Sequence, residues 1–520
     1  MRRRVLALLI IFSILLVACE SEDQGMAESI PDFISMEDEA VLEYAVPKSV
    51  PHILVDQLGY LPGHTKQAFF FGSTMPETFS ICLKEDSSVK YQGKTETRGY
   101  SDVYDCNVAI GDFSDFNESG EYYICADYLG ESYSFSIEDD IYNNIFYAAQ
   151  RNYYYNRCGI TITDEYGHNA CHTANAVLRE DMTQTADVTG GWHQDATGSK
   201  DIQSAAQTTA VMLLAYELYG DAFSDDVGIP ESGNGIPDIL DEIHFETDWL
   251  FKMQDSKTGA VYSAVTVVSK DKSEKIYLEA PSIDAAYAYA FVMAKMSYIY
   301  QRFDREYATS CLQAADRAWK YCALNESGDD ASEWKMAATA EIYRASGLKD
   351  CRKYLDEYFL EPRAEIMDDP KNPAFYGGIT YLSTTQKIDN EACNIIISRI
   401  LKNAENISSE ARSSSFLVPC DEEQANNAEL LNRMITQIIV DYVITNHEYD
   451  NVIENYLHYF LGRNPISLSY IDGAGTISYQ EVSPGMGIMK QFDNNAKLIF
   501  LLSKIVDRQD IQKTSMKVSS

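Results

Sequence analysis

The residues best suited to chemistry lie around a turn of two glycines in the second quarter of the chain. Cys158 and the neighbouring pair Cys171 and His172 precede this turn, and His193 follows it. Two thiols with two imidazoles match the donor set of a closed structural zinc site. The spacing alone leaves two readings open. One is a zinc site, for which His168 is a substitute ligand, and the other is a Cys158–Cys171 disulfide beside a solvent-facing His193.

Carboxylates follow the same turn and lead into a predicted helix. Asp195 and Asp201 stand in the stretch GGWHQDATGSKD, and a carboxylate in such a place can activate water as a general base. A second pair, Glu231 and Asp238, lies in a glycine-rich segment that begins another predicted helix. Oxygen donors of this kind suit calcium, whereas helix capping and turn formation are the alternative.

Two kinds of secondary structure must position these residues. Between residues 50 and about 138, short runs rich in aromatic and β-branched residues alternate with Gly, Pro, Asn and Asp, which predicts a β-sandwich. From Tyr142 onward, about a dozen segments carry apolar residues at three- and four-residue spacing and predict helices. Many of these helices are apolar on wide faces, and an α/α toroid of antiparallel helix pairs would bury them, with a cleft at one rim.

The N-terminus has the form of a bacterial export signal. Arg2 to Arg4 precede an apolar run from Val5 to Ala18, which is short for a bilayer span. The run ends in a lipobox-like Leu-Val-Ala-Cys, so we expect cleavage before Cys19 and a lipid anchor that tethers the protein to the cell surface. The expected segments are a signal peptide (1–19), a flexible acidic stalk (20–48), the sandwich (49–139), the helical module (140–508) and a tail (509–520).

Composition limits the expected partners, and the positions of the cysteines suggest one disulfide. The formal net charge is −37, and such an acidic surface repels phosphate backbones, so we expect no nucleic-acid partner. We expect a monomer. Among the 11 cysteines, Cys106 and Cys125 flank a hairpin-like stretch and are the pair that we predict to form a disulfide.

Several further segments carry a specific resemblance. They are Val55–Pro62 (VDQLGYLP), Arg157–Gly159 (RCG), Gly190–His193 (GGWH), Pro230–Asp238 (PESGNGIPD), Trp249–Gln254 (WLFKMQ), Ala314–Trp319 (AADRAW) and Leu461–Pro465 (LGRNP). In this order, from about residue 50 to 507, they resemble glycoside hydrolase family 9 with its N-terminal immunoglobulin-like domain.

The resemblance implies both a fold and an activity. The fold would be an (α/α)6 barrel preceded by an Ig-like sandwich, and the activity would be hydrolysis of β-1,4-glucans such as cellulose. Inverting enzymes of this kind pair a general base with a general acid, roughly 6.5–9.5 Å apart. The resemblance also implies a structural zinc on the four Cys and His residues named above. With a sugar substrate, Tyr155 or Trp192 can supply a stacking face, and core packing is the alternative.

The catalytic positions depart from the family's pattern. Read with one inserted residue, Asp195 matches the first Asp of the family's turn, Ser199 falls at the base, and Asp201 lies two residues further on. Met489 falls at the general acid, and Glu481 is the Glu of that loop that would replace it. Two functions follow as hypotheses: a surface-anchored β-glucan hydrolase with an altered carboxylate pair, or a surface glycan-binding protein with impaired catalysis.

Overall fold

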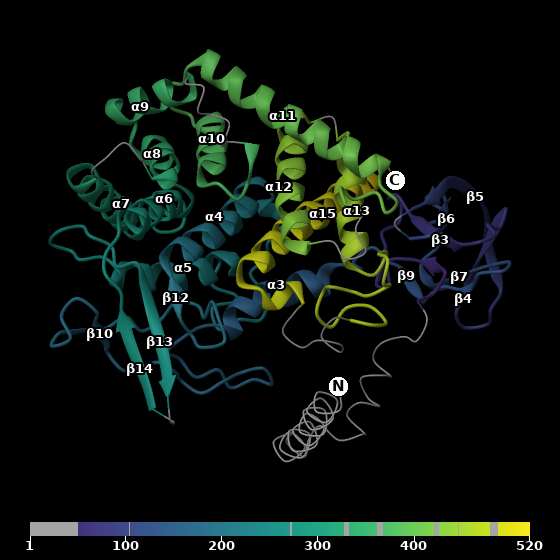
Figure 1. Ribbon diagram of the computed structural model, residues 1–520, viewed down its shortest axis with the longest axis horizontal. Helices are drawn as coiled ribbons and strands as arrows, with labels where there is room; N and C mark the ends of the chain where they lie inside the picture. Colours follow the sequence, from purple (N-terminus) through teal and green to yellow (C-terminus); the bar gives the residue numbers. More distant parts are fainter. Residues whose placement is uncertain are drawn as a thin grey trace, which may run out of the picture. The chain divides into compact units, whose positions relative to one another are not determined.

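The computed structural model describes residues 50–102, 104–270, 273–326, 332–360, 368–420, 426–445, 447–478 and 487–519 (Figure 1). The predicted signal peptide with Cys19, the acidic stalk and Glu481 lie outside these ranges. No helix within them combines the length and apolar character that a membrane crossing requires.

The first described part is the predicted β-sandwich. Its strands are β1 (Ile53–Leu54), β2 (Gly59–Tyr60), β3 (Gln67–Gly72), β4 (Thr78–Leu83), β5 (Val89–Ser101), β6 (Cys106–Asp112), β7 (Gly120–Ala126), β8 (Gly130–Glu131) and β9 (Phe135–Ile137). They pair in the order β1-β3-β6-β5-β4-β7-β9-β2, with β8 on β7. The long strand β5 joins both layers, because its first half pairs with β4 and its second half with β6. Buried aromatic side chains, among them Tyr60, Phe79 and Phe135, fill the space between the layers.

The sandwich corrects the prediction about its cysteines. Cys106 lies on β6 and Cys125 on β7, and strands β5 and β4 separate these two in the sheet order. Cys125 instead faces Cys82 of the adjacent strand β4, with the two Sγ atoms 3.6 Å apart. The predicted Cys106–Cys125 bridge is therefore wrong, and all three thiols are free.

Helices make up most of the remaining described chain. They are α3 (Asn143–Tyr155), α4 (Ile202–Leu218), α5 (Asp238–Lys252), α6 (Ile283–Tyr300), α7 (Arg305–Asn325), α8 (Glu333–Ser346), α9 (Lys349–Leu360), α10 (Pro373–Ser383), α11 (Asn390–Ser413), α12 (Asn427–Ile444), α13 (Asp450–Phe460) and α15 (Phe492–Ser519). Helix α15 continues through the residues predicted as a tail, because that stretch contains no Gly or Pro to end it.

Alternate helices form the inner ring of an (α/α)6 barrel, as predicted. Helix α4 packs on α6 and α15, α6 packs on α8, α8 on α10, and α12 on α15. The odd-numbered helices from α3 to α13 form the outer layer (Figure 1). The inner helices α4 and α6 are buried on nearly every side, which explains why they are apolar all round.

The inner helices begin at one rim of the barrel, because alternate helices run in the same direction. Five of them begin at a side chain that accepts a hydrogen bond from the first turn: Asp201, Ser282, Ser332, Asn372 and Asn426. Trp334 of α8 donates its indole N–H to Gln203 Oε1 of α4, at 2.9 Å. Asp201 thus lies on the rim at which the helix N-termini meet.

A small second sheet was not predicted. Its strands are β10 (Ala176–Leu178), β11 (Thr185–Ala186), β12 (Lys200–Asp201), β13 (Ala264–Lys270) and β14 (Ser273–Leu278), in the order β11-β10-β14-β13-β12. Strands β13 and β14 form a hairpin between α5 and α6 that extends away from the helices (Figure 1). The sheet joins the chain segment after His172 to the carboxylate turn, since β10 pairs with β14 and β12 with β13.

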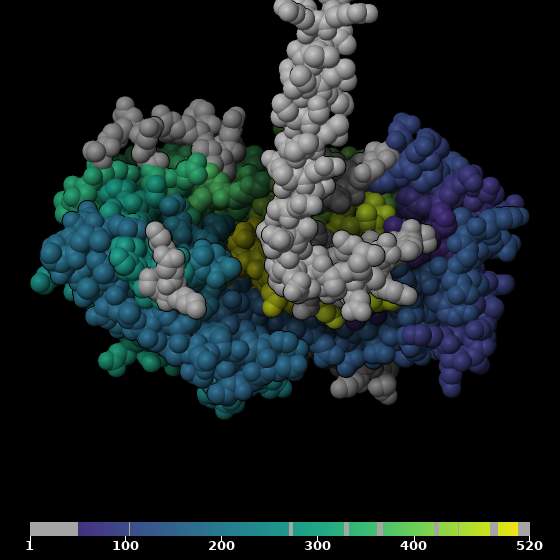
Figure 2. Space-filling model, turned by 60° about the horizontal axis from the view of Figure 1, so that its bottom comes forward, coloured from purple at the N-terminus to yellow at the C-terminus, as the bar shows by residue number. Residues whose placement is uncertain are grey.

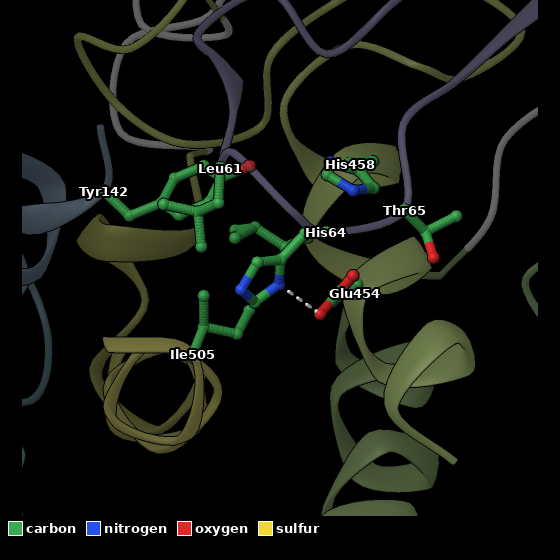
Figure 3. Close-up of a pocket in the computed structure, with 8 residues that line it drawn as sticks. Leu61, His64, Thr65, Tyr142, Glu454, His458 and Ile505 are labelled. Carbon is green, nitrogen blue, oxygen red and sulfur yellow. Dashed lines mark hydrogen bonds and ion pairs between the residues drawn. The ribbon is translucent and has the colours of Figure 1, made fainter. Parts of the chain in front are cut away.

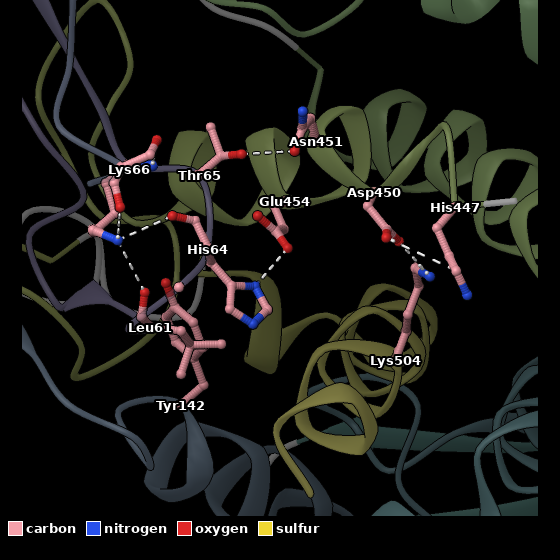
Figure 4. A network of polar contacts seen from close by, with 12 residues as sticks. Leu61, His64, Thr65, Lys66, Tyr142, His447, Asp450, Asn451, Glu454 and Lys504 are labelled. Carbon is pink, nitrogen blue, oxygen red and sulfur yellow. Dashed lines mark hydrogen bonds and ion pairs between the residues drawn. The ribbon is translucent and has the colours of Figure 1, made fainter. Parts of the chain in front are cut away.

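The sandwich contacts the barrel through polar side chains. His64 Nδ1 lies 2.8 Å from Glu454 Oε1 of α13, and Thr65 Oγ1 donates to Asn451 Oδ1 at 2.7 Å (Figures 3 and 4). The cavity beside His64 has a volume of about 10 Å³, which is room for roughly one water molecule. This contact is therefore a packed interface rather than a ligand site.

Gln57 of the VDQLGYLP segment extends the same interface. Its amide donates to the Ser467 carbonyl at 2.7 Å and accepts from the Thr476 and Ile477 N–H groups, each at 3.0 Å. The Gln57 N–H also donates to the carbonyl of Leu461, the first residue of LGRNP. This bond joins two of the segments that carry the family resemblance.

An ion-pair network joins the last helices of the barrel. Lys504 Nζ of α15 lies 2.6 Å from Asp441 Oδ2 of α12. It also lies 3.0 Å from Asp450 Oδ1 of α13 (Figure 4). Asp441, His447 and Asp450 are close enough together to hold a metal ion. The Lys504 ammonium supplies positive charge to both carboxylates, so we interpret the group as structural.

A second buried network crosses the inner ring. Lys295 Nζ of α6 lies 2.9 Å from Glu217 Oε2 of α4 and 3.2 Å from Glu341 Oε1 of α8, and Arg344 of α8 pairs with both carboxylates. Burial alone would raise the pKa of Glu217, but Lys295 and Arg344 outweigh burial and lower it to about 2.

This network predicts a specific pH dependence of stability. An unfolded Glu has a pKa of about 4.3, so the contribution of Glu217 is fully present above that pH and is lost as the pH falls toward about 2. Glu217→Gln should lower the free energy of unfolding at pH 7 by about 3 kcal/mol, and this difference should shrink by more than half at pH 3. Denaturant titrations at both pH values measure this difference in the free energy of unfolding.

The control is Asp316→Asn, which removes an exposed ion pair with Lys320 and should change the free energy of unfolding little. A Glu217→Gln difference that stays constant between the two pH values would contradict the prediction.

Candidate functional site

A short backbone pairing brings the predicted metal ligands together. The Cys158 N–H donates to the Gly191 carbonyl and the His193 N–H to the Asn156 carbonyl, both at 2.8 Å. Gly191 has a φ of 68°, and a Cβ there would lie 2.7 Å from the Trp249 ring. Only glycine suits such a position, so the double glycine of the motif is needed to seat the turn against α5.

All four predicted ligands converge. Cys158 Sγ lies 3.5 Å from His172 Nδ1, and Cys171 Sγ lies 3.2 Å from His193 Nε2. One donor atom of each residue lies within 4.8 Å of the other three. Both thiols are free, so they do not form the alternative disulfide. The His168 ring stands 5.5 Å from the His193 ring but is not a member of this group. Figure 2 shows the face of the molecule on which the loops around residues 160–200, coloured blue, lie.

The electrostatics of the group suit a divalent cation. Burial raises the pKa of Cys158 to about 11, although the nearby Lys200 ammonium acts in the opposite direction. Burial, together with the neighbouring His172 and His168, lowers the pKa of His193 to about 4. His193 is therefore neutral at pH 7, which is the form that binds metals. Two thiols and two imidazoles in a partly buried group fit a tetrahedral metal such as zinc, whose charge would stabilise the thiolates.

Trp192 is a structural residue, contrary to the prediction that it can face a sugar. It is fully buried, its backbone N–H donates to Glu246 Oε2 at 2.7 Å and its indole N–H to Glu242 Oε2 at 3.2 Å. Arg157 also pairs with Glu242, at 2.8 Å. Sequence reasoning missed both glutamates, although their four-residue spacing on the buried face of a predicted helix was a usable signal.

Asp195 is exposed and closes its own turn. Its Oδ1 accepts hydrogen bonds from the Thr197 N–H at 2.8 Å, the Thr197 hydroxyl at 2.7 Å and the Ser199 N–H at 3.0 Å. The Ser199 hydroxyl accepts from the Val267 N–H of the β13–β14 hairpin, at 3.1 Å. The turn that the sequence marks as catalytic is thus fixed to the small sheet.

Asp201 is half-buried and lies at the start of α4. Its carboxylate accepts from the Ser204 N–H at 2.9 Å and caps the helix. The Gln194 side chain accepts from the Asp201 N–H at 2.7 Å and donates to its carbonyl at 2.9 Å. Gln194, the residue read as an insertion, therefore holds Asp201 in place.

Met489, the residue predicted to stand at the position of the family's acid, is buried. The Met489 N–H donates to Asp472 Oδ2 at 3.1 Å, and the Asn152 amide donates to the Met489 carbonyl at 2.7 Å. Burial raises the pKa of Asp472. Asp472 is thus a further carboxylate beside Met489, and the sequence pattern alone does not single it out. Glu481 lies outside the described residues, so its place relative to Asp201 stays a prediction.

Tyr155 is half-buried at the end of α3. The Arg151 guanidinium lies over its ring at 5.4 Å from the centroid, and the exposed Tyr166 stands edge-on at 5.6 Å. Tyr155 is therefore part of a partly exposed aromatic group, and its predicted role in sugar stacking stays a prediction.

A third group of carboxylates lies where the glycine-rich segment meets the first turn of α5. Asp225, Asp238 and Asp241 each offer an oxygen within 4.8 Å of the others, which is a donor type that suits calcium. Glu231, named with Asp238 from the sequence, is not a member, because it pairs with Arg157 at 2.9 Å. Asp238 Oδ2 accepts from the Val227 N–H at 2.6 Å, so turn formation accounts for at least part of this group.

Comparisons with known proteins agree with this architecture. The sequence model described as glycosyl hydrolase family 9 matches residues 142–486, and that of the cellulase N-terminal Ig-like domain matches residues 48–131. Endoglucanase D of Acetivibrio thermocellus is 27% identical over 462 residues, which cover 81% of this chain and 73% of that protein.

Solved structures share the fold over most of the chain. A metagenome-derived family 9 endoglucanase has a TM-score of 0.79 at 25% identity, covering 88% of this chain and 99% of its own. A Zn-binding triple mutant of the family 9 endoglucanase J30 has a TM-score of 0.74 at 20% identity, covering 86% and 99%. From the sandwich, the helical ring and these matches together, we conclude that this chain belongs to glycosyl hydrolase family 9 and carries the family's N-terminal Ig-like domain.

Proposed function

We propose that the protein is an extracellular, endoglucanase-like hydrolase of β-1,4-glucans whose catalytic carboxylates depart from the family's pattern. The observation that carries this proposal is the position of Asp201, a half-buried carboxylate at the N-terminus of the inner helix α4. It lies on the rim where Gln203 and Trp334 of two inner helices also meet. Endoglucanase D, which aligns with 81% of this chain, is an endoglucanase by name.

Asp201 is the proposed general base, and Glu481 is the proposed acid. Gln194 fixes the Asp201 backbone from both sides, and a fixed carboxylate can hold and activate a water molecule beside the sugar. Asp195 is the less suitable base, because one of its oxygens accepts three bonds from its own turn. An inverting mechanism requires the Asp201 and Glu481 carboxyl groups to lie roughly 6.5–9.5 Å apart.

A pair of isosteric variants tests this assignment. Asp201→Asn should lower the release of reducing sugar from carboxymethylcellulose or lichenan by about 10²–10⁴-fold, because an amide cannot accept the proton of water. The unfolding midpoint should stay the same, since Asn caps helices as well as Asp does. Asp195→Asn is the matched control and should keep a rate near that of the wild type. A wild-type rate in Asp201→Asn would exclude Asp201 as the base.

The second candidate function is glycan binding without turnover. It is favoured by Met489, since a thioether at the acid position cannot protonate a leaving group. If the wild-type protein is retarded in a gel that contains β-glucan but releases no reducing sugar, this second function replaces the first.

We further propose that Cys158, Cys171, His172 and His193 hold one structural zinc ion. Zinc, when bound, would tie together the ends of three chain segments that the fold brings to one point. Support comes from the four donors within 4.8 Å and from a zinc-binding mutant with the same fold.

Elemental analysis should find about one zinc per purified chain. Cys171→Ser should lower the zinc content sharply and lower the unfolding midpoint, because three donors hold the ion less tightly than four. Cys393→Ser, which removes a half-buried thiol of α11 outside the group, should leave both unchanged. A metal-free protein with a Cys158–Cys171 disulfide found by peptide mapping would refute the zinc site.

Finally, we propose that a lipid on Cys19 anchors the protein at the bacterial surface, on the basis of the N-terminal sequence alone. Cell fractionation checks this: the wild-type chain should be recovered with membranes, and Cys19→Ala should be lost from that fraction.

A further inference from the structure

One of the four metal-binding candidates has a carboxylate on its far side. The Nδ1 atom of His172 faces the group, 3.5 Å from Cys158 Sγ, while its Nε2 atom lies 3.4 Å from Glu274 Oε2. Glu274 belongs to β14 and is distant in sequence from every other residue around the group. The imidazole of His172 thus lies between a cluster of metal donors and a carboxylate.

The backbone of His172 and the surroundings of its ring fix this orientation. His172 has a φ of 48°, a conformation that few residues with a side chain adopt. A Cβ on Gly198 would lie 2.2 Å from His172 Cε1, so the ring packs directly against that glycine. The ring therefore lies against the Gly198 backbone, with Nδ1 towards Cys158 and Nε2 towards Glu274.

The turn from Asp195 to Asp201 holds the hairpin that carries Glu274 beside His172. Lys200 and Asp201 of β12 pair with Val265 and Ala264 of β13, and the Val267 N–H donates to the Ser199 hydroxyl at 3.1 Å. Strand β14 pairs along the length of β13 and also with β10, close behind His172 in the chain. Glu274 is thus placed by an ordered sheet.

A neutral imidazole carries one N–H, and the partner of that N–H decides which nitrogen is free to bind a metal. Metal-binding histidines generally donate their second ring nitrogen to a carboxylate or carbonyl group, and losing that partner typically costs 10–100-fold in metal affinity. Glu274 can be this partner, because its Oε2 lies 3.4 Å from Nε2 while Nδ1 faces the cluster.

We propose that Glu274 is a positioning residue of the metal centre. Its carboxylate accepts the Nε2–H of His172, which fixes the tautomer, orients the ring and makes Nδ1 a stronger ligand. The β13–β14 hairpin therefore belongs functionally to the metal centre, and it connects that centre to the turn of Asp195 and Ser199. This proposal rests on the proposed zinc site.

The test is the loss of zinc from the purified full-length protein to an excess of a chromogenic chelator. Glu274→Ala should weaken zinc retention by about 10–100-fold, and Glu274→Gln, which keeps an oxygen acceptor, should recover part of that loss. Glu279→Ala is the matched control, because Glu279 follows the same strand but pairs with Arg179 at 3.1 Å and not with the group. This control should retain zinc as the wild type does.

A second measurement separates positioning from simple stability. The unfolding midpoint of Glu274→Ala should fall below that of the wild type when both proteins are loaded with zinc. In a Cys171→Ser background, where the metal centre is broken, the same change should have little effect. An equal fall in both backgrounds would mean that Glu274 is only structural and would overturn the proposal.

The outcomes also distinguish the two proposals. A wild-type protein without zinc refutes the metal centre itself, and the role of Glu274 with it. A zinc-containing wild type whose zinc retention is matched by Glu274→Ala refutes only the role of Glu274.

Discussion

Two buried glutamates of one outer helix hold the candidate site in place. Glu242 and Glu246 of α5 bind the indole and the backbone of Trp192, and Glu242 also pairs with Arg157. Because Arg157 and Trp192 directly precede Cys158 and His193, these bonds set the positions of two metal-binding candidates. Burial raises the pKa of Glu242 to about 7 and that of Glu246 to about 8, and the bonds to Arg157 and Trp192 offset only part of this effect. The positions of these metal-binding candidates therefore depend on α5, a helix that contributes none of the four residues.

The parts of the fold that follow from local patterns could be predicted from the sequence. Helical periodicity identified the barrel because each inner helix is apolar on wide faces and needs neighbours on both sides. The metal-binding group was predictable because its four residues have distinctive chemistry and flank one glycine turn. Gly191 confirms the reasoning, since its positive φ and its contact with Trp249 leave no room for a side chain.

The errors concern pairings that no local pattern reveals. For Trp192 the sequence allows both sugar stacking and core packing, because aromatic residues serve both, and its burial against the glutamates of α5 shows that it packs in the core. The hairpin-like stretch between Cys106 and Cys125 suggests that these two pair, whereas the strand order places Cys125 beside Cys82. Residues 265–268 are all β-branched and favour a strand, but this run is short and lies between two strong helices, so the helical pattern around it hides the hairpin. Asp472 and Glu274 likewise gain significance only from distant partners.

The bond between Gln57 and Ser467 joins positions 410 residues apart. A contact that distant forms only after nearly the whole chain is available, and such contacts slow the search for the native state. During synthesis, the surface of the sandwich that contacts the barrel would stay exposed until the last helices have been made. In the exported protein that we propose, this delay would be an advantage, because a chain that has not yet completed its fold can still pass through a secretion channel.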